Sequence, residues 1–269
     1  MASNSNHVTT RKTRLLRKLF AYALLVACAA PASADSHLTR DFAEDAKLYF
    51  TAPLRWDGDD WLHVGETVAL VGLAHQFDGD VRDHFVAGKI APLSGDDPHS
   101  ARDAVPAAAI VVATWAGAFL AQNSDGYAEG RDMLEATVFS SITTTLVKYA
   151  AQRSRPNETA DPNAWRERGD SFPSLHTSAA FAIGTVLAES GSDNHRWLRR
   201  FLGYGIAGAT AYARLHDNVH WLSDTVAGAA VGVASARFVT HREDARSRTA
   251  SVSLLPVDGG LVLSYNAIF

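Results

Sequence analysis

Residues 211–224 read Ala-Tyr-Ala-Arg-Leu-His-Asp-Asn-Val-His-Trp-Leu-Ser-Asp, in which Arg214, His220 and Asp224 follow the spacing Arg-x5-His-x3-Asp. An apolar run rich in glycine and alanine, residues 225–236, follows at once. If a helix begins near His220, then His220 and Asp224 lie four residues apart on one of its faces. The carboxylate can then accept the imidazole Nδ1–H, which fixes the tautomer and leaves Nε2 as a nucleophile. Arg214 would offer a planar fork of donors to an oxyanion, although a helical His/Asp pair alone is more often structural.

Two earlier stretches add to this triplet. Residues 148–156 read Lys-Tyr-Ala-Ala-Gln-Arg-Ser-Arg-Pro, and residues 171–177 read Ser-Phe-Pro-Ser-Leu-His-Thr, directly before an apolar run. They carry the patterns Lys-x6-Arg-Pro and Pro-Ser-x-His. In this order and at these separations, the three stretches resemble the signature of the type 2 phosphatidic acid phosphatase family. That family also includes bacterial nonspecific acid phosphatases and, more distantly, vanadium haloperoxidases.

The resemblance implies an all-α fold, a helical bundle of the type 2 phosphatidic acid phosphatase and haloperoxidase kind. It also implies a phosphatase that works through a phosphohistidine intermediate. In this scheme His220 attacks phosphorus, Asp224 orients and stabilises its imidazolium, and His176 protonates the leaving oxygen and later activates water. The phosphate-binding residues that it implies are Lys148, Arg155, Ser174, Leu175 and Arg214.

The residue types fit this chemistry. A phosphate monoester is dianionic, so its site must concentrate positive charge and hydrogen-bond donors. Lys148 and Arg155 are seven residues apart, and we expect them to share a helix face until Pro156 ends the helix. A helix that begins at Leu175 attracts an anion through its free N–H groups. Because the cations do what magnesium does elsewhere, we expect no metal and no cofactor. Three neighbours are interpreted as rim or structural residues: Arg153, His216 and Asp217.

The chain departs from the family pattern at two positions. Leu175 stands where the family usually has glycine, and a leucine does not readily adopt a positive φ. Ala213 stands where the third block usually has serine. Neither change removes a reacting group, so we expect both to affect rate and substrate fit rather than the chemistry.

Residues 1–34 are interpreted as an export signal peptide with a basic start, an apolar middle and a small-residue cleavage site. This predicts a periplasmic or cell-envelope location. Residues 25–28, Leu-Val-Ala-Cys, resemble a bacterial lipoprotein box, so lipid anchoring at Cys28 is an alternative to discarding the leader. Removing the leader takes away five basic residues and changes the formal net charge from −4 to −9. A protein this acidic is not expected to bind nucleic acid.

The rest of the chain predicts a helical phosphatase domain over 35–248 and a β-hairpin over 249–269 that packs on it. Helices are expected over 61–77, 130–152, 177–189, 197–213 and 222–239. Aspartate and glycine breaks at 57–60, 78–80 and 95–98 are interpreted as solvated turns rather than calcium loops. The uncharged segment 104–121 is long enough to raise the question of a membrane span, yet alanine-rich enough for a bundle core.

The sequence therefore predicts an exported, metal-independent phosphatase that hydrolyses phosphate monoesters or pyrophosphates, above all those of lipids. The alternatives are a broad-specificity periplasmic acid phosphatase on soluble esters, a vanadium haloperoxidase, and a binding protein without catalysis. A phosphorylated small molecule or lipid is the expected substrate. Peripheral membrane association and the oligomeric state stay open.

Overall fold

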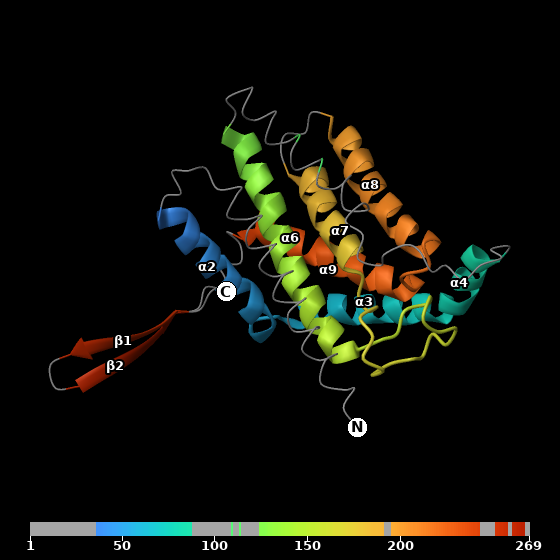
Figure 1. Cartoon of the computed structure of the whole chain (residues 1–269). Coiled ribbons are helices and arrows are strands. Elements are labelled where there is room, and N and C mark those ends of the chain that lie inside the picture. The colour runs from blue at the N-terminus through green and yellow to red at the C-terminus, as the bar shows by residue number, and fades with distance from the viewer. Residues whose placement is uncertain are drawn as a thin grey trace, which may run out of the picture. The chain divides into compact units, whose positions relative to one another are not determined.

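The computed structural model describes residues 36–87, 124–190, 195–242, 251–257 and 260–266, with the isolated positions 109 and 113. Its contacts cluster into two units, residues 1–44 and residues 45–269, and the candidate site lies within the second. The described helices, drawn in Figure 1, are α2 (Ser36–Thr51), the short 3-10 helix η1 (Ala52–Leu54), α3 (Gly58–Gln76), α4 (Asp78–Val86), α6 (Ser124–Ala151), α7 (Leu175–Glu189), α8 (Arg196–His216) and α9 (Leu222–Thr240). The predicted all-helical fold class is confirmed.

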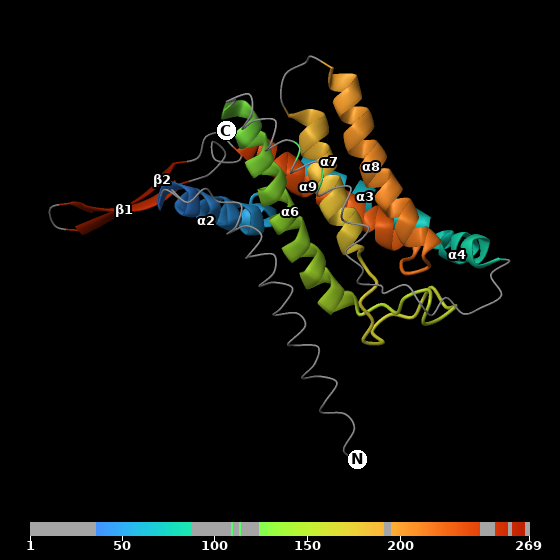
Figure 2. The ribbon, with the colours of Figure 1, turned by 45° about the horizontal axis from the view of Figure 1, so that its top comes forward.

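Helix α7 is the centre of the bundle. It packs against α6, α8 and α9, and α3 packs on α9. Figures 1 and 2 show α7 between α6 and α8, with α9 crossing it. Residues on nearly every side of α7 are buried, which explains why the sequence over this helix is apolar rather than amphipathic.

The close approach of α7 and α8 depends on a pair of glycines. A Cβ on Gly184 would lie 2.5 Å from the carbonyl oxygen of Gly203, and a Cβ on Gly203 would lie 2.3 Å from that of Gly184. Any side chain at either position would therefore collide with the backbone of the other helix. The two helices can touch backbone to backbone only because both residues lack a Cβ.

The aspartate-rich breaks begin helices. At the first, Asp57 Oδ1 accepts from the backbone N–H of Asp60 at 3.0 Å, and Asp60 Oδ2 accepts from that of Asp57 at 3.2 Å. This capping box starts α3. At the second break, Asp78 is fully buried, so the prediction of a solvated turn is wrong for this residue. Its carboxylate is stabilised by an arginine far along the chain, which the local sequence does not show.

The predicted C-terminal β-hairpin packed on the domain is not supported. The backbones of β1 (Ser251–Val257) and β2 (Gly260–Asn266) run antiparallel, with Leu254 opposite Leu263. The substantial contacts of each strand are with the other. An isolated pair of strands is marginally stable in water. The part of the predicted fold class that is supported is the helical one.

Other expectations lie outside the described residues. These are the leader at 1–34 with Cys28, the break at 95–98 and, apart from positions 109 and 113, the uncharged segment 104–121. Among the helices of the described part of the chain, none is long and apolar enough to cross a membrane.

Candidate active site

The ends of four helices meet at one end of the bundle. Two connections bring them together, residues 152–174 between α6 and α7 and residues 217–221 between α8 and α9. The backbone N–H of Ser174, just before α7, donates to the carbonyl of Asp224 in the first turn of α9 at 2.9 Å. All eight residues predicted from the sequence lie on these helix ends and connections: Lys148, Arg155, Ser174, Leu175, His176, Arg214, His220 and Asp224.

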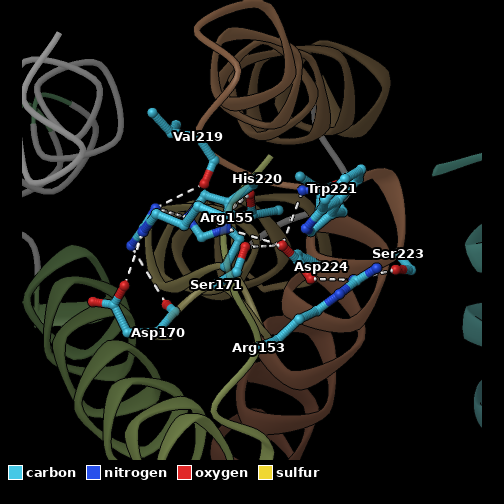
Figure 3. A network of polar contacts seen from close by, with 12 residues as sticks. Arg153, Arg155, Asp170, Ser171, Val219, His220, Trp221, Ser223 and Asp224 are labelled. Atoms are coloured by element: carbon cyan, nitrogen blue, oxygen red, sulfur yellow. Dashed lines mark hydrogen bonds and ion pairs between the residues drawn. The ribbon is translucent and has the colours of Figure 1, made fainter. Parts of the chain in front are cut away.

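His220 and Asp224 are in contact, although His220 is not on the helix. Helix α9 begins at Leu222, so the expectation that both residues share a helical face is wrong. Asp224 instead turns back over the start of the helix, where its Oδ2 accepts from the backbone N–H of Trp221 at 2.9 Å. The same oxygen lies 3.3 Å from His220 Nδ1 (Figure 3). A proton on Nδ1 directed at this carboxylate leaves the lone pair of the imidazole on Nε2.

Arg155 lies on the other side of the imidazole. Its Nη1 is 3.4 Å from His220 Nε2 and donates to the carbonyl oxygen of Val219 at 2.8 Å. Its Nε donates to Asp170 Oδ1 at 2.9 Å. The guanidinium is thus fixed from two sides beside the nitrogen that would act as nucleophile, as Figure 3 shows.

Lys148 joins this arrangement through the backbone. Its Nζ donates to the carbonyl oxygen of Ser171 at 3.0 Å and also to that of Asp170. The prediction that Lys148 and Arg155 share a helix face is wrong, because α6 ends at Ala151 and Gln152 has a φ of 50°. A left-handed residue at that point stops the helix. Lys148 and Arg155 meet instead at Asp170, which accepts from both.

The environment of His220 keeps its imidazole neutral. The side chain is almost fully buried, and this burial, followed by the positive charges of Arg155, Lys148 and Arg214 and by His176, holds the pKa of His220 well below its usual 6.5. Both effects disfavour the imidazolium. These interactions also show that the three predicted cations and His176 lie near His220.

The start of α7 supplies the remaining predicted residues. Ser174 is the buried N-cap residue, and its Oγ accepts from Thr177 Oγ1 at 3.0 Å. Leu175 is the first helical residue and His176 the second, both half-buried. Because Leu175 lies within a helix, its backbone φ is an ordinary one, and the glycine of the family pattern is not needed for the turn.

The sequence analysis gave no role in the site to two charged residues, Arg153 and Asp78. Arg153 is fully buried, and its guanidinium pairs with Asp224 Oδ1 at 2.7 Å and with Asp78 Oδ2 at 2.6 Å. It was interpreted as a rim or structural residue, and a place at the rim is wrong because the guanidinium is fully buried. Its place two residues before Arg155 was the only local signal, and nothing in the local sequence indicates that Asp78 is its partner.

Two other neighbours of the site, Ser171 and His216, each contact an aspartate. Ser171 Oγ donates to Asp224 Oδ2, a contact that sequence reasoning did not predict. His216 is exposed and lies 3.2 Å from Asp217 Oδ1 through its Nδ1. In the described part of the chain no group of three or more acidic, histidine or cysteine side chains has the arrangement of a metal site.

Comparison with known proteins points to one family. Residues 129–248, which include all eight predicted site residues, match the PAP2 superfamily. The lipid A 1-phosphatase of Porphyromonas gingivalis is 37% identical over 86 residues, which is 32% of this chain. That match covers 17% of the length of the curated relative.

Two solved structures are also similar. One is a transmembrane PAP2 type phosphatidylglycerolphosphate phosphatase from Bacillus subtilis, with 18% identity and a TM-score of 0.40 over 84% of this chain and 96% of that one. The other is Aquifex aeolicus LpxE, with 17% identity and a TM-score of 0.34 over 60% of this chain and 93% of that one.

Proposed function

Because residues 129–248 belong to the PAP2 superfamily, we propose that this chain is a phosphatase that hydrolyses phosphate monoesters or pyrophosphates through a phosphohistidine at His220. The observation that carries the proposal is the setting of His220. A buried imidazole has Nδ1 directed at Asp224 and Nε2 beside Arg155, and its pKa is well below the usual value. Such a histidine is neutral at physiological pH and can attack an anion that the cations hold.

The first chemical step forms the phosphoenzyme. His220 Nε2 attacks phosphorus, the P–N bond forms, and the bond from phosphorus to the leaving oxygen breaks. His176 gives its proton to that oxygen. The imidazole of His220 becomes cationic, and Asp224, which accepts from Nδ1, stabilises the new charge.

The second step releases phosphate. Water attacks the phosphorus of the phosphohistidine, His176 takes a proton from it, and the P–N bond breaks. His220 returns to its neutral form. Because the intermediate is shared by both steps, alcohols in place of water would receive the phosphoryl group as a side reaction.

Positive charge in the site comes from Lys148, Arg155 and Arg214. In this proposal they hold the equatorial oxygens of the transition state, where preorganised donors contribute most. Three fixed cations supply the charge that a magnesium ion supplies in other phosphoryl-transfer sites. The proposal therefore includes metal-independent turnover.

The proposed substrates are lipid phosphates. The relative from Porphyromonas gingivalis is a lipid A 1-phosphatase, and Leu175 places an apolar side chain directly before His176, the proton donor to the leaving group. The leader predicted at 1–34 would place the enzyme in the periplasm or cell envelope.

A substrate panel on the purified protein tests this function. Turnover of detergent-dispersed lipid phosphates is compared with that of p-nitrophenyl phosphate, with EDTA and with orthovanadate. We expect hydrolysis that survives EDTA and is inhibited by vanadate, and an acid-labile phosphoenzyme. His220→Ala should lower turnover at least about a thousandfold, or about 4 kcal/mol. The exposed His63 on α3 is the matched control, and near-normal turnover in His220→Ala would refute the proposal.

A further inference from the structure

Behind Asp224 lies a row of three buried charges that reaches from the start of α9 to the start of α4. Arg153 bridges two carboxylates, with Nη1 2.7 Å from Asp224 Oδ1 and Nη2 2.6 Å from Asp78 Oδ2. All three side chains are fully buried. The guanidinium also lies over the rings of Trp165, at 4.5 Å, and Trp221, at 5.1 Å. Water is thus kept from every member of the row.

Asp78 holds both Arg153 and the first turn of α9. Its Oδ1 accepts from the backbone N–H of Ser223 at 2.8 Å, and its Oδ2 accepts from Ser223 Oγ at 2.6 Å. Ser223 Oγ in turn accepts from Arg153 Nη1 at 2.8 Å. His75 closes the outer end of the row, with Nδ1 2.8 Å from Asp78 Oδ2. The residue next to Asp224 is therefore fixed by the same carboxylate that fixes its arginine.

The charge of the row bears on the imidazolium that forms at His220. Asp224 and Arg153 alone would sum to zero, and a neutral pair stabilises a neighbouring cation weakly. With Asp78 added, the formal charges of Asp224, Arg153 and Asp78 sum to −1. In surroundings without water, that charge acts with little screening.

The geometry points to Asp78 and Arg153 as positioning residues for catalysis, an inference that rests on the proposed function. Arg153 holds one oxygen of Asp224, so that the other faces His220 Nδ1, as Figure 3 shows for Arg153, Asp224 and His220. Asp78 offsets the charge of Arg153, so that Asp224 keeps its effect on the imidazolium. Neither residue touches the position proposed for the substrate, and both act through Asp224.

The variant Asp78→Asn tests the inference at pH 8. It keeps the size of the side chain and removes its charge. We expect kcat to fall about tenfold to a hundredfold, the range for a group that stabilises a charged transition state indirectly. KM should stay within about threefold, because the cations that hold the phosphate are unchanged. The control is Asp83→Asn on the same helix, whose side chain is 73% exposed, and it should keep the normal kcat.

A double variant separates positioning from a structural effect. If Asp78 acts through Asp224, then Asp78→Asn with Asp224→Asn should have the kcat of Asp224→Asn alone, within about twofold. If the fold reduction of kcat in the double variant equals the product of the reductions in the two single variants, the inference is overturned. An unchanged kcat in Asp78→Asn would overturn it as well. Should Asp78→Asn fail to fold by circular dichroism, Arg153→Lys takes its place. Lysine keeps the charge but cannot bridge both carboxylates, so kcat must fall at least about fivefold with KM preserved.

These outcomes are distinct from failure of the proposed function. If the unmodified protein hydrolyses no phosphate substrate, the function itself is wrong. If it is active, His220→Ala is inactive and Asp78→Asn or Arg153→Lys keeps the normal kcat, then only the role of the buried row is wrong.

Discussion

Gly228 of α9 lies against the backbone carbonyl of Ser174: a Cβ built on Gly228 would be 2.5 Å from that oxygen and 3.3 Å from the Cβ of Thr177. The start of α7 therefore rests directly on α9, one turn beyond Asp224. This contact sets the separation between the two halves of the site, because Ser174 and His176 lie on one side of it and His220 and Asp224 on the other.

Gly228→Ala should weaken both folding and catalysis. The added methyl must push α7 away from α9, and overpacking of this kind costs about 1–3 kcal/mol. The same shift moves His176 away from His220, so kcat should fall by more than the loss of folded protein explains. Urea unfolding and steady-state kinetics at a temperature where the variant is folded measure the two effects.

The matched control is Gly208→Ala in α8. A Cβ there would meet no atom within 4 Å, so removing the glycine should stabilise the helix by about 0.5–1 kcal/mol. If Gly228→Ala is as stable and as active as Gly208→Ala, the contact with Ser174 does not set the geometry of the site.

The pKa of His220 gives a second prediction. The imidazole in an unfolded chain titrates near 6.5, and burial with nearby cations lowers the pKa of His220 well below that value. As the pH falls below 6.5, the imidazole of the unfolded chain takes up a proton, whereas His220 of the folded protein does not. The free energy of unfolding therefore decreases as the pH falls below 6.5. The nucleophile, in contrast, stays neutral and active.

Histidine NMR can measure this directly. In a protein labelled with nitrogen-15 at its histidines, the signals absent from His220→Gln identify the residue. We expect these signals to keep the shifts of a neutral Nδ1–H imidazole from pH 8 to well below 6.5. A transition at or above pH 6.5 would show that the cations do not act on His220 as described.

That these residues lie close together could be predicted from the sequence because the proposed chemistry fixes their types and order. Lysine, arginine, histidine and aspartate stand in three blocks at the spacing of the family, and the structure gathers them around His220. What the spacing could not give is how the backbone presents them. The end of α6 at Ala151 places Arg155 in a connection, and the start of α9 at Leu222 leaves His220 ahead of the helix.

Partners distant in the chain were beyond the sequence. Arg153 and Asp78 are 75 residues apart, and each looks locally like a polar residue at a turn. They form an ion pair because the start of α4 packs beside α9, and the connection that carries Arg153 brings its guanidinium between Asp78 and Asp224. Buried charges are paired because an unpaired one is costly, but a single sequence does not show which residue is the partner.

Glu135 provides a prediction on stability. This residue of α6 is buried, and burial, with the negative charge of Asp45 and, less strongly, of Asp132, raises its pKa to about 7 against the opposing charges of Arg242 and Arg131. Below pH 4.5 the residue is neutral in both states. As the pH rises from 4.5 to 7, Glu135 loses its proton in the unfolded chain but keeps it in the folded protein. The free energy of unfolding therefore decreases over this range.

Glu135→Gln should remove this loss. Glutamine is neutral at every pH, so the variant should be more stable than the unmodified protein at pH 8, by on the order of 3 kcal/mol at most. At pH 4.5 the two should differ little. Urea unfolding at both pH values measures the difference. Glu66→Gln, at an exposed position on α3, should show no such gain, and an equal gain there would rule out burial as the cause.

Leu175 determines the last prediction, on substrate choice. It is the half-buried first residue of α7, directly before His176, so its isobutyl group is expected beside the leaving group that His176 protonates. An apolar wall there favours a lipid over a small polar alcohol. Leu175→Gly should therefore shift the ratio of kcat/KM toward p-nitrophenyl phosphate and away from detergent-dispersed phosphatidic acid, by a few-fold to about a hundredfold, the range for one apolar contact.

The control is Leu222→Gly, because Leu222 is also a half-buried leucine at the first position of a helix, α9. Both substitutions place a glycine in a first helical turn, so both should change stability to a similar, small degree. Only the change at Leu175 should alter the substrate ratio. If the ratio is the same in both variants and in the unmodified protein, the side chain of Leu175 does not line the substrate site, and the preference for lipids would then have to come from another wall of the pocket.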